Sequence, residues 1–191
     1  MKPGTRVLGI AESFGADESS TLGGVVMTCS GRVDDFVFGR CTVGGTDISE
    51  SIIEMVERLD REDIRFLLIA GVALAWYNII DLEAIHAETA LPTIAVTFEA
   101  SDGLETAIEE NIDDRSTMED RHERYARLPP RRAVTVNKTT LYLREAGCRP
   151  SEADEVIIQC TESVDARPAP LRVARLAARA VDAYRTTNAN A

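Results

Sequence analysis

Residues 23–43 read GGVVMTCSGRVDDFVFGRCTV and decide the fold. Residues 23–29 and 33–43 are rich in β-branched and aromatic side chains, and Phe36 and Phe38 recur at period two, which is the spacing of a strand. The turn residues 30–32 (SGR) separate the two runs. An apolar run at residues 6–10 (RVLGI) precedes them as another short buried strand. Three strands joined by short loops are expected to form an antiparallel meander.

The hydrophobic period then changes from two to that of a helix. Apolar residues recur at helical spacing at Ile48, Ile52, Met55, Val56 and Leu59. Asp47, with Glu50 three positions later, has the form of a capping box for this helix. Continuous apolar runs at residues 65–70 and 93–96 are typical of buried parallel strands, and residues 78–88 between them predict another helix.

The C-terminal half is charged and less regular. Residues 102–132 are helical in character, and a short strand is expected at 134–136, a short helix at 139–146, a last strand at 155–159 and a terminal helix from Pro168 to about Tyr184. We expect one domain over residues 1–185 and a loose polar tail over 186–191. The order predicts an α/β fold: a mixed sheet, with an antiparallel three-strand meander and then parallel strands, and helices on both faces. Ribonuclease H-like folds have this layout.

Charge and hydropathy limit the classes of function. The chain has 191 residues, with 32 acidic and 21 basic side chains, so its formal net charge is −11. Lys2 and Lys138 are its lysines, and an acidic surface that avoids lysine indicates either a salt-loving cell or an ordinary acidic cytosolic protein. No apolar run reaches the roughly 20 residues that span a bilayer, and no signal peptide precedes the first strand. We expect a cytoplasmic protein without a membrane partner.

The four cysteines, Cys29, Cys41, Cys148 and Cys160, form no Cys-x-x-Cys pair, so a structural zinc site is not expected. Cys29 and Cys41 fall on neighbouring predicted strands. They either face each other or, as a reducing cytosol favours, remain buried thiols.

Four segments together resemble an archaeal family catalogued as domain of unknown function 99, the endonuclease dU family, which is related to endonuclease V. The segments are residues 7–10 (VLGI), 43–47 (VGGTD), 77–81 (YNIID) and 168–176 (PAPLRVARL). The resemblance implies an endonuclease V-like, ribonuclease H-like fold and a role in DNA repair. It also implies a Mg²⁺-dependent nuclease directed at DNA with deaminated bases, deoxyuridine or deoxyinosine, whose metal is held by carboxylates of the first strand, the middle strand and nearby loops.

The sequence differs from the pattern of this family at the positions that would supply the metal ligands. Ala11 replaces the aspartate that usually ends the first strand, and Ala70 replaces the aspartate before the glycine of the middle strand. Ala169 and Arg175 stand where the terminal motif usually has glutamate and histidine. A methyl group cannot bind a hard cation, which demands oxygen ligands, so impaired catalysis is expected.

The carboxylates that remain near these positions are Glu12, Asp17, Glu18, Asp47 and Asp81. Glu12 and Asp47 are the candidates for catalysis and for holding Mg²⁺. Glu12 lies one residue past the expected acid, so it points to the opposite face unless the strand has already become a loop. Asp47 matches a family acid but has a helix cap as its alternative role, and Asp81 favours a structural role at a helix start.

Candidate nucleic-acid contacts lie just after the middle strand and on the terminal helix. Asn78 follows a buried strand at its carboxyl end, where α/β sheets bind ligands, and Tyr77 or Trp76 suits stacking on an unpaired base. A helix cap by Asn78 and core packing of the rings are the alternatives.

Arg172, Arg175 and Arg179 lie at i, i+3 and i+7 on one helix face, a spacing that suits phosphates. The alternative is a solvated face paired with acids. The opposite stripe, Leu171, Ala174, Ala178 and Val181, is expected to pack on the sheet. Lys138 joins a second, weaker basic cluster with Arg131 and Arg132.

Two functions therefore stand side by side. One is a DNA endonuclease of the dU type with impaired catalysis. The other is a non-catalytic relative on the same fold that binds nucleic acid or protein. The sequence does not indicate an oligomeric state.

Overall fold

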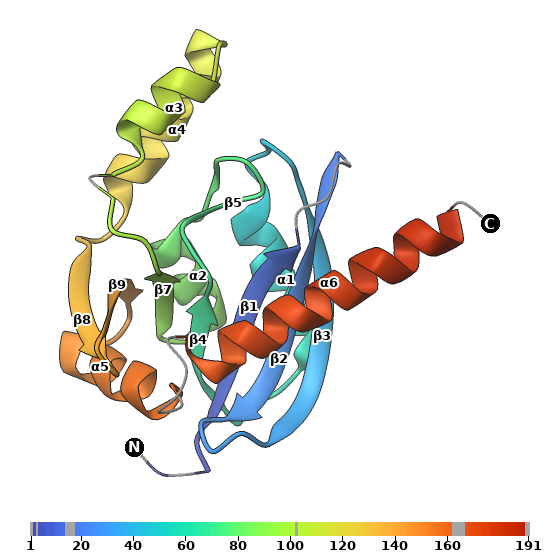
Figure 1. Cartoon of the computed structure of the whole chain (residues 1–191), viewed down its shortest axis with the longest axis vertical. Helices are drawn as coiled ribbons and strands as arrows, with labels where there is room; N and C mark the ends of the chain where they lie inside the picture. Colours follow the sequence, from blue (N-terminus) through green and yellow to red (C-terminus); the bar gives the residue numbers. More distant parts are fainter. Residues whose placement is uncertain (1, 3, 14–17, 102, 162–166, 190–191) are drawn as a thin grey trace.

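The structure is a computed structural model that describes residues 2, 4–13, 18–101, 103–161 and 167–189 (Figure 1). Its elements are β1 (Arg6–Ser13), β2 (Ser19–Thr28), β3 (Val33–Thr42), α1 (Ile48–Leu59), β4 (Ile64–Ile69), β5 (Ala73–Leu74), β6 (Asn78–Ile79), α2 (Leu82–Thr89), β7 (Thr93–Thr97), α3 (Glu105–Asn111), α4 (Arg115–Arg127), β8 (Arg132–Val136), β9 (Thr139–Ala146), α5 (Pro150–Gln159) and α6 (Ala169–Ala189).

Seven of the strands form one mixed sheet in the order β3-β2-β1-β4-β7-β9-β8. Strands β1, β2 and β3 make the predicted antiparallel meander, and β4 and β7 follow it as parallel strands beside β1. The hairpin of β8 and β9 extends the sheet, with β9 antiparallel to β7. The two short strands β5 and β6 pair with each other apart from this sheet. The predicted fold class is therefore confirmed.

Helices cover both faces of the sheet, and β1 is accordingly buried on both of its faces. Leu8 and Ile10 pack in one core cluster with Ile52 of α1, whereas Val7 packs on the opposite face in a cluster with Val156 of α5. In Figure 1, α6 crosses β1 and β2 in front of the sheet, α1 and α2 lie behind it, and the hairpin of α3 and α4 projects away from the sheet.

The position of α6 depends on two glycines of the sheet. A Cβ atom at Gly9 would lie 2.6 Å from the Pro170 backbone, and one at Gly23 would lie 2.6 Å from the Ala174 carbonyl oxygen. The absence of side chains there lets the backbone of α6 lie directly on β1 and β2. Leu171, Ala174 and Ala178 of the predicted apolar stripe are buried against the sheet. The helix continues to Ala189, beyond the end expected near Tyr184.

Two predictions for the C-terminal half are wrong. Residues 139–146, expected as a helix, form strand β9, in which Leu141 and Leu143 are both fully buried. Positive φ angles at Asn137 and Lys138 close the hairpin that joins β8 to β9. Residues 155–159, expected as a strand, belong to helix α5, which begins with a proline at its first turn.

The helix expected over residues 78–88 begins later, at Leu82. Asn78 instead belongs to β6. Asp81 is the N-cap of α2, and its carboxylate accepts a hydrogen bond of 3.0 Å from the Ala84 amide. This contact supports the structural interpretation of Asp81.

The expected state of Cys29 is also wrong. Cys29 forms a disulfide with Cys160, across a sequence separation of 131 residues, rather than facing Cys41 or remaining a thiol. The bond ties the end of β2 to the end of α5. Cys41 and Cys148 are free, and burial raises the pKa of the Cys41 thiol to about 12.

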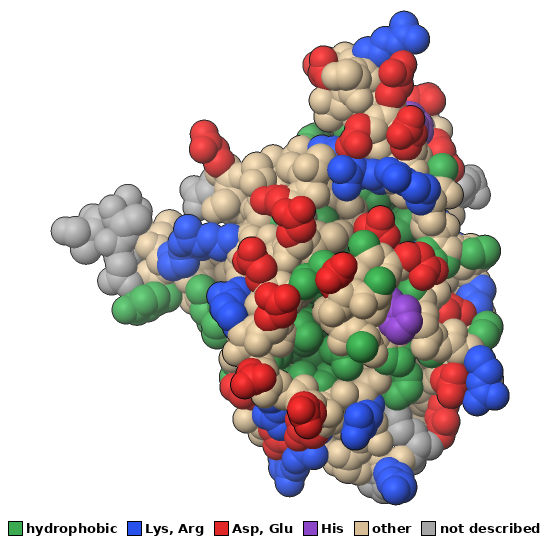
Figure 2. All heavy atoms as spheres, turned by 180° about the vertical axis from the view of Figure 1, so that it is seen from behind, with side chains coloured by type: hydrophobic (Ala, Val, Ile, Leu, Met, Phe, Trp, Pro, Cys, Tyr) green, Lys and Arg blue, Asp and Glu red, His purple; other side chains and the backbone are tan. Residues whose placement is uncertain are grey.

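The face of the molecule opposite to the view of Figure 1 is mixed in character. Figure 2 shows carboxylate side chains scattered over this face among Lys and Arg side chains, with a hydrophobic area in its lower half. None of the helices in the described part of the chain is long and apolar enough to cross a membrane.

The close approach of α6 is testable with Gly23→Ala. The added methyl group meets backbone atoms of α6, which cannot rotate away, so we expect the free energy of unfolding to fall by about 1–3 kcal/mol. Urea denaturation followed by circular dichroism measures the change. Gly4→Ala is the matched control, because a Cβ atom there meets no heavy atom within 4 Å. Equal losses in the two variants would contradict this account of how α6 is seated.

Candidate functional site

The carboxyl ends of β1 and β4 lie side by side. The two strands are parallel neighbours, with Ile10 in register with Ile69, and the Ala70 amide donates a hydrogen bond of 3.0 Å to the Ile10 carbonyl. Ala11 and Ala70 therefore emerge at the same edge of the sheet. Ligands of α/β sheets bind outside such strand ends, so this edge is the candidate site.

Glu12 does not lie on the same face of β1 as Ala11, where the resemblance implies an acid. Strand β1 continues to Ser13, and Glu12 stays paired with Leu22 of β2, so its side chain leaves on the other face from Ala11. Its carboxylate accepts hydrogen bonds from the Ala75 amide at 2.6 Å and the Ser20 hydroxyl at 3.1 Å. Burial raises the pKa of Glu12, although these two hydrogen bonds and the charge of Arg175 oppose the rise.

Asp47 lies in the loop after β3, and three donor groups hold its carboxylate. Its carboxylate accepts from the Thr42 amide at 3.0 Å, the Thr42 hydroxyl at 2.8 Å and the Asn78 side-chain amide at 2.7 Å. Burial alone would raise the pKa of Asp47, but the hydrogen bonds from Thr42 and Asn78 outweigh it, and the pKa lies below the ordinary value.

Asn78, rather than Asp47, caps α1. Its side-chain oxygen accepts a hydrogen bond of 3.3 Å from the Ile48 amide, and its nitrogen also donates to the Thr42 carbonyl at 3.0 Å. The expected capping box of Asp47 and Glu50 is wrong, because the Asp47 side chain makes no hydrogen bond to the helix. Asn78 is fully buried, so its three hydrogen bonds fix the turn before α1.

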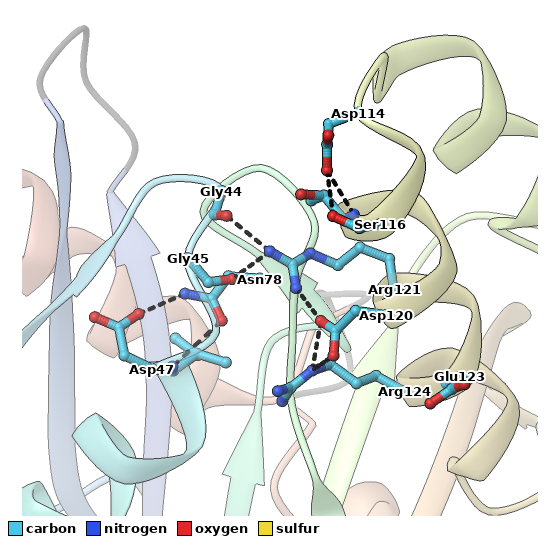
Figure 3. A network of polar contacts seen from close by, with 12 residues as sticks. Gly44, Gly45, Asp47, Asn78, Asp114, Ser116, Asp120, Arg121, Glu123 and Arg124 are labelled. Carbon is cyan, nitrogen blue, oxygen red and sulfur yellow. Dashed lines mark hydrogen bonds and ion pairs between the residues drawn. The ribbon is translucent and has the colours of Figure 1, made fainter.

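Arg121 joins α4 to the same loop, as Figure 3 shows. Its guanidinium donates to the carbonyls of Gly44 at 2.7 Å and Gly45 at 2.9 Å and pairs with Asp120 at 2.6 Å. The side chain is only 3% exposed. Sequence reasoning missed this residue, because an arginine among the charges of residues 102–132 carries no signal of burial.

The turn that carries Trp76 is strained. Ala75, Trp76 and Tyr77 have φ angles of 44°, 60° and 57°, a run of left-handed residues that costs roughly 1–2 kcal/mol each. Two contacts hold this turn: the Ala75 amide bonds to Glu12, and the Ala75 carbonyl accepts from the Gly44 amide at 2.7 Å. Trp76 is 52% exposed and meets the Tyr77 ring edge-on, at 5.4 Å between centroids.

The basic candidates lie at the same edge of the sheet. Arg175 and Arg179 of α6 line a cavity of about 320 Å³ together with Ala11, Glu12 and Ala70. Arg172 lines an adjoining cavity beside them. Lys138 is exposed in the turn between β8 and β9, which extends past the carboxyl end of β7 because Thr97 is in register with Tyr142.

The described residues do not fit a Mg²⁺ site. Within residues 2, 4–13, 18–101, 103–161 and 167–189, no three acidic, histidine or cysteine side chains converge as metal ligands. Methyl groups occupy the strand ends at Ala11 and Ala70, and one oxygen of Glu12 and both oxygens of Asp47 already accept hydrogen bonds. Asp17, another carboxylate near the first strand, lies outside the described residues.

The hydrogen bonds of Asp47 predict a pH-dependent loss of stability. Because its pKa is lowered in the folded state, its contribution is present above the unfolded value of about 3.9 and is lost as the pH falls through the folded pKa. We expect Asp47→Asn to reduce the free energy of unfolding at pH 7 by about 1–3 kcal/mol, with a smaller difference at pH 2–3. Denaturant titrations across this range measure it. Asp113→Asn, at an exposed residue, is the control, and equal stability of both variants would contradict the prediction.

Glu12 predicts the opposite pH dependence. Because burial raises its pKa, its protonated form favours the folded state; this contribution is complete below the unfolded value of about 4.3 and is lost as the pH rises through the folded pKa. Glu12→Gln should therefore match the parent protein near pH 4 and exceed its stability at pH 7. Thermal unfolding from pH 4 to 8 tests this, with exposed Glu18→Gln as the control. A Glu12→Gln variant less stable than the parent at pH 7 would refute it.

Archaeal relatives match along nearly the whole chain. A UPF0215 protein of Thermococcus kodakarensis is 35% identical over 190 residues, which cover 95% of this chain and 94% of the relative. A UPF0215 protein of Pyrobaculum calidifontis is 33% identical over 180 residues, covering 93% and 97% of the two chains.

Solved structures share the fold. A protein of unknown function from Archaeoglobus fulgidus has a TM-score of 0.79 at 26% identity, over 92% of this chain and 97% of that one. Endonuclease V of Ciona intestinalis, crystallised with inosine-containing DNA, has a TM-score of 0.63 at 14% identity, over 94% and 87% of the chains. The sequence profile of endonuclease dU matches residues 3–182, and family and fold together support a nuclease-like function. The chain belongs to the endonuclease dU family.

Proposed function

We propose that this protein binds DNA containing deoxyuridine or deoxyinosine at the carboxyl edge of its sheet, and that its ability to cleave the phosphodiester is impaired. Membership in the endonuclease dU family and the shared fold of the inosine-DNA complex from Ciona intestinalis support the choice of substrate. We place this activity in the cytoplasm of a salt-loving cell, on the basis of the acidic, lysine-poor composition.

The arginine face of α6 is the observation that carries the proposal. Its buried stripe fixes the helix on β1 and β2. Arg175 and Arg179 are exposed beside that packing, where they line the cavity at the strand ends, and Arg172 is half-buried. The net charge of −11 would repel phosphates elsewhere on the surface. A local row of guanidinium groups beside the strand ends therefore gives a nucleic-acid backbone one preferred position.

The strained turn supplies the base contact in this proposal. Trp76 presents an exposed ring at a turn held by Glu12, and Tyr77 supports it edge-on. Aromatic rings stack on unpaired bases with about 1–3 kcal/mol each, whichever base is present. Asn78 contributes through its hydrogen bond to the first amide of α1, which anchors the end of this turn. Lys138 adds a positive charge beyond the carboxyl end of β7.

Impaired catalysis is proposed from the chemistry of the strand ends. Ala11 and Ala70 offer no oxygen ligand, and we assign no hydrolytic step to a metal ion here. Glu12 and Asp47 are the carboxylates to substitute if Mg²⁺-dependent cleavage is found. A non-catalytic relative that binds nucleic acid is the alternative, and the same arginine face favours it over a protein ligand.

We expect DNA binding without nicking. Fluorescence anisotropy with a labelled uracil- or inosine-containing strand, titrated from low to high salt, measures affinity and its salt dependence. The double variant Arg175→Ala and Arg179→Ala should lower the slope of log affinity against log salt by about 1 for each arginine. Nicking is followed on a denaturing gel with Mg²⁺ or Mn²⁺.

Two controls make the result specific. Arg58→Ala removes an exposed arginine of α1, on the other face of the sheet, and should leave the salt slope unchanged. An undamaged strand of the same length should bind more weakly if deaminated bases are recognised. Metal-dependent nicking that disappears in Asp47→Ala would refute impaired catalysis, and an unchanged slope in the double variant would refute the role of α6.

A further inference from the structure

Arg175 forms a wall of three cavities at the carboxyl edge of the sheet. The first, of about 320 Å³, is bounded at the strand ends by Ala11 and Ala70. The second, of about 330 Å³, lies along α6 between Arg167 and Arg179. The third, of about 360 Å³, spans the ends of β4 and β7. A ligand that enters any of them meets the Arg175 side chain.

Positive charge dominates these walls although the whole chain is acidic. The second cavity is lined by Leu176 and by Arg167, Arg172, Arg175 and Arg179, without a carboxylate. Among the described residues, no salt bridge takes up the guanidinium groups of Arg175 and Arg179, and Glu12 is the carboxylate that faces Arg175.

Neutral groups orient the arginines of the third cavity. Arg131 donates to the Ser101 carbonyl at 2.6 Å, and its guanidinium lies 3.9 Å above the centre of the Tyr142 ring. Arg144 donates to the Pro129 carbonyl and to the Tyr125 hydroxyl, the latter at 3.1 Å. Carbonyls and aromatic rings position a guanidinium without cancelling its charge.

The strand ends do not oppose an anion. Ala11 and Ala70 present methyl groups there, which carry no charge. The Glu12 carboxylate shares this cavity, but one of its oxygens accepts from both the Ala75 amide and the Ser20 hydroxyl. In the described part of the chain, this edge of the sheet therefore combines two guanidinium groups, of Arg175 and Arg179, with the methyl groups of Ala11 and Ala70 and the single carboxylate of Glu12. The positive groups outnumber the carboxylate, an arrangement that suits an anion better than a divalent cation.

We propose that the cavity at the ends of β1 and β4 is a metal-independent phosphate site, in which Arg175 and Arg179 bind phosphate oxygens of a nucleic acid. The site occupies the position where the family resemblance expects Mg²⁺ between carboxylates. Guanidinium groups bind phosphate through paired, charge-assisted hydrogen bonds and need no metal bridge. The identity of the ligand as nucleic acid rests on the proposed function, whereas the phosphate chemistry rests on the cavity.

The first experiment separates the site from the DNA. Calorimetric titration with inorganic pyrophosphate is carried out in EDTA, because Mg²⁺ itself binds pyrophosphate, and anisotropy with a labelled deoxyuridine strand is carried out in EDTA and again in Mg²⁺. The parent protein should bind both ligands in EDTA, and its affinity for the strand should change by less than about twofold on adding Mg²⁺, since a twofold change is well under 1 kcal/mol. Arg175→Gln should weaken both by about 10-fold or more, the loss expected for one charge-assisted contact. Arg58→Gln, an exposed arginine on the opposite face, is the matched control and should change neither.

A second pair of variants isolates charge at the strand end. Ala70→Asp and Ala70→Asn add side chains of the same shape, and Ala70 is only partly buried, so both are expected to fold. In EDTA, Ala70→Asp should weaken pyrophosphate binding about 10-fold relative to Ala70→Asn, because only the carboxylate repels the anion. Thermal unfolding of both variants confirms equal folding.

The possible results discriminate between the claims. Binding that disappears in EDTA and returns with Mg²⁺ would overturn the metal-independent site, as would equal affinities of Arg175→Gln and Arg58→Gln. Absence of pyrophosphate binding by the parent protein would overturn it too, even if DNA binds elsewhere. Pyrophosphate binding without DNA binding would instead support the site and refute the proposed function.

Discussion

The contact between the backbone of α6 and two glycines of the sheet determines what the edge of the sheet can bind. Gly9 and Gly23 place no side chain between the strands β1 and β2 and the helix. The backbone of α6 therefore lies directly against these strands, without a layer of side chains between them. Its arginines consequently reach the ends of β1 and β4. A larger residue at either position would lift the helix and remove the guanidinium groups from the cavity that they line.

A second constraint is a network of hydrogen bonds that holds the loops of the site. Glu12, Asp47, Asn78 and Arg121 use almost all of their hydrogen bonds to hold backbone groups of the loops after β3 and β5. Such a network costs free energy if it is half satisfied, so its members fix one conformation together. In this fold Glu12 and Asp47 therefore organise the turn that exposes Trp76 and the loop beside it, and they do so with one oxygen of Glu12 and both oxygens of Asp47.

How far the sequence predicts the structure depends on the kind of signal. Period-two patterns and a glycine turn correctly predict the meander, and continuous apolar runs predict β4 and β7. Strand β9 was missed because Gly147 resembles a helix end, whereas the alternation of Leu141 and Leu143 and the Asn137-Lys138 turn were the better signals. In α5, Pro150 and Glu152 signalled a helix start that the apolar residues 156–158 concealed.

The candidate site shows where local patterns stop being informative. The row of arginines on α6 is visible at helical spacing, but the seat of Asp47 depends on Asn78, 31 residues away, and the disulfide joins Cys29 to a cysteine 131 residues distant. Neither contact produces a periodic pattern in the sequence. The alanines at positions 11 and 70 depart from the pattern that the resemblance implies, and this departure is visible in the sequence. The position of Arg175 beside both alanines, which supports the proposed anion site, is visible only in the structure. In the proposed site, guanidinium groups of α6 lie beside two strand ends that carry no carboxylate, which favours an anion, and the acidic remainder of the surface would repel that anion elsewhere.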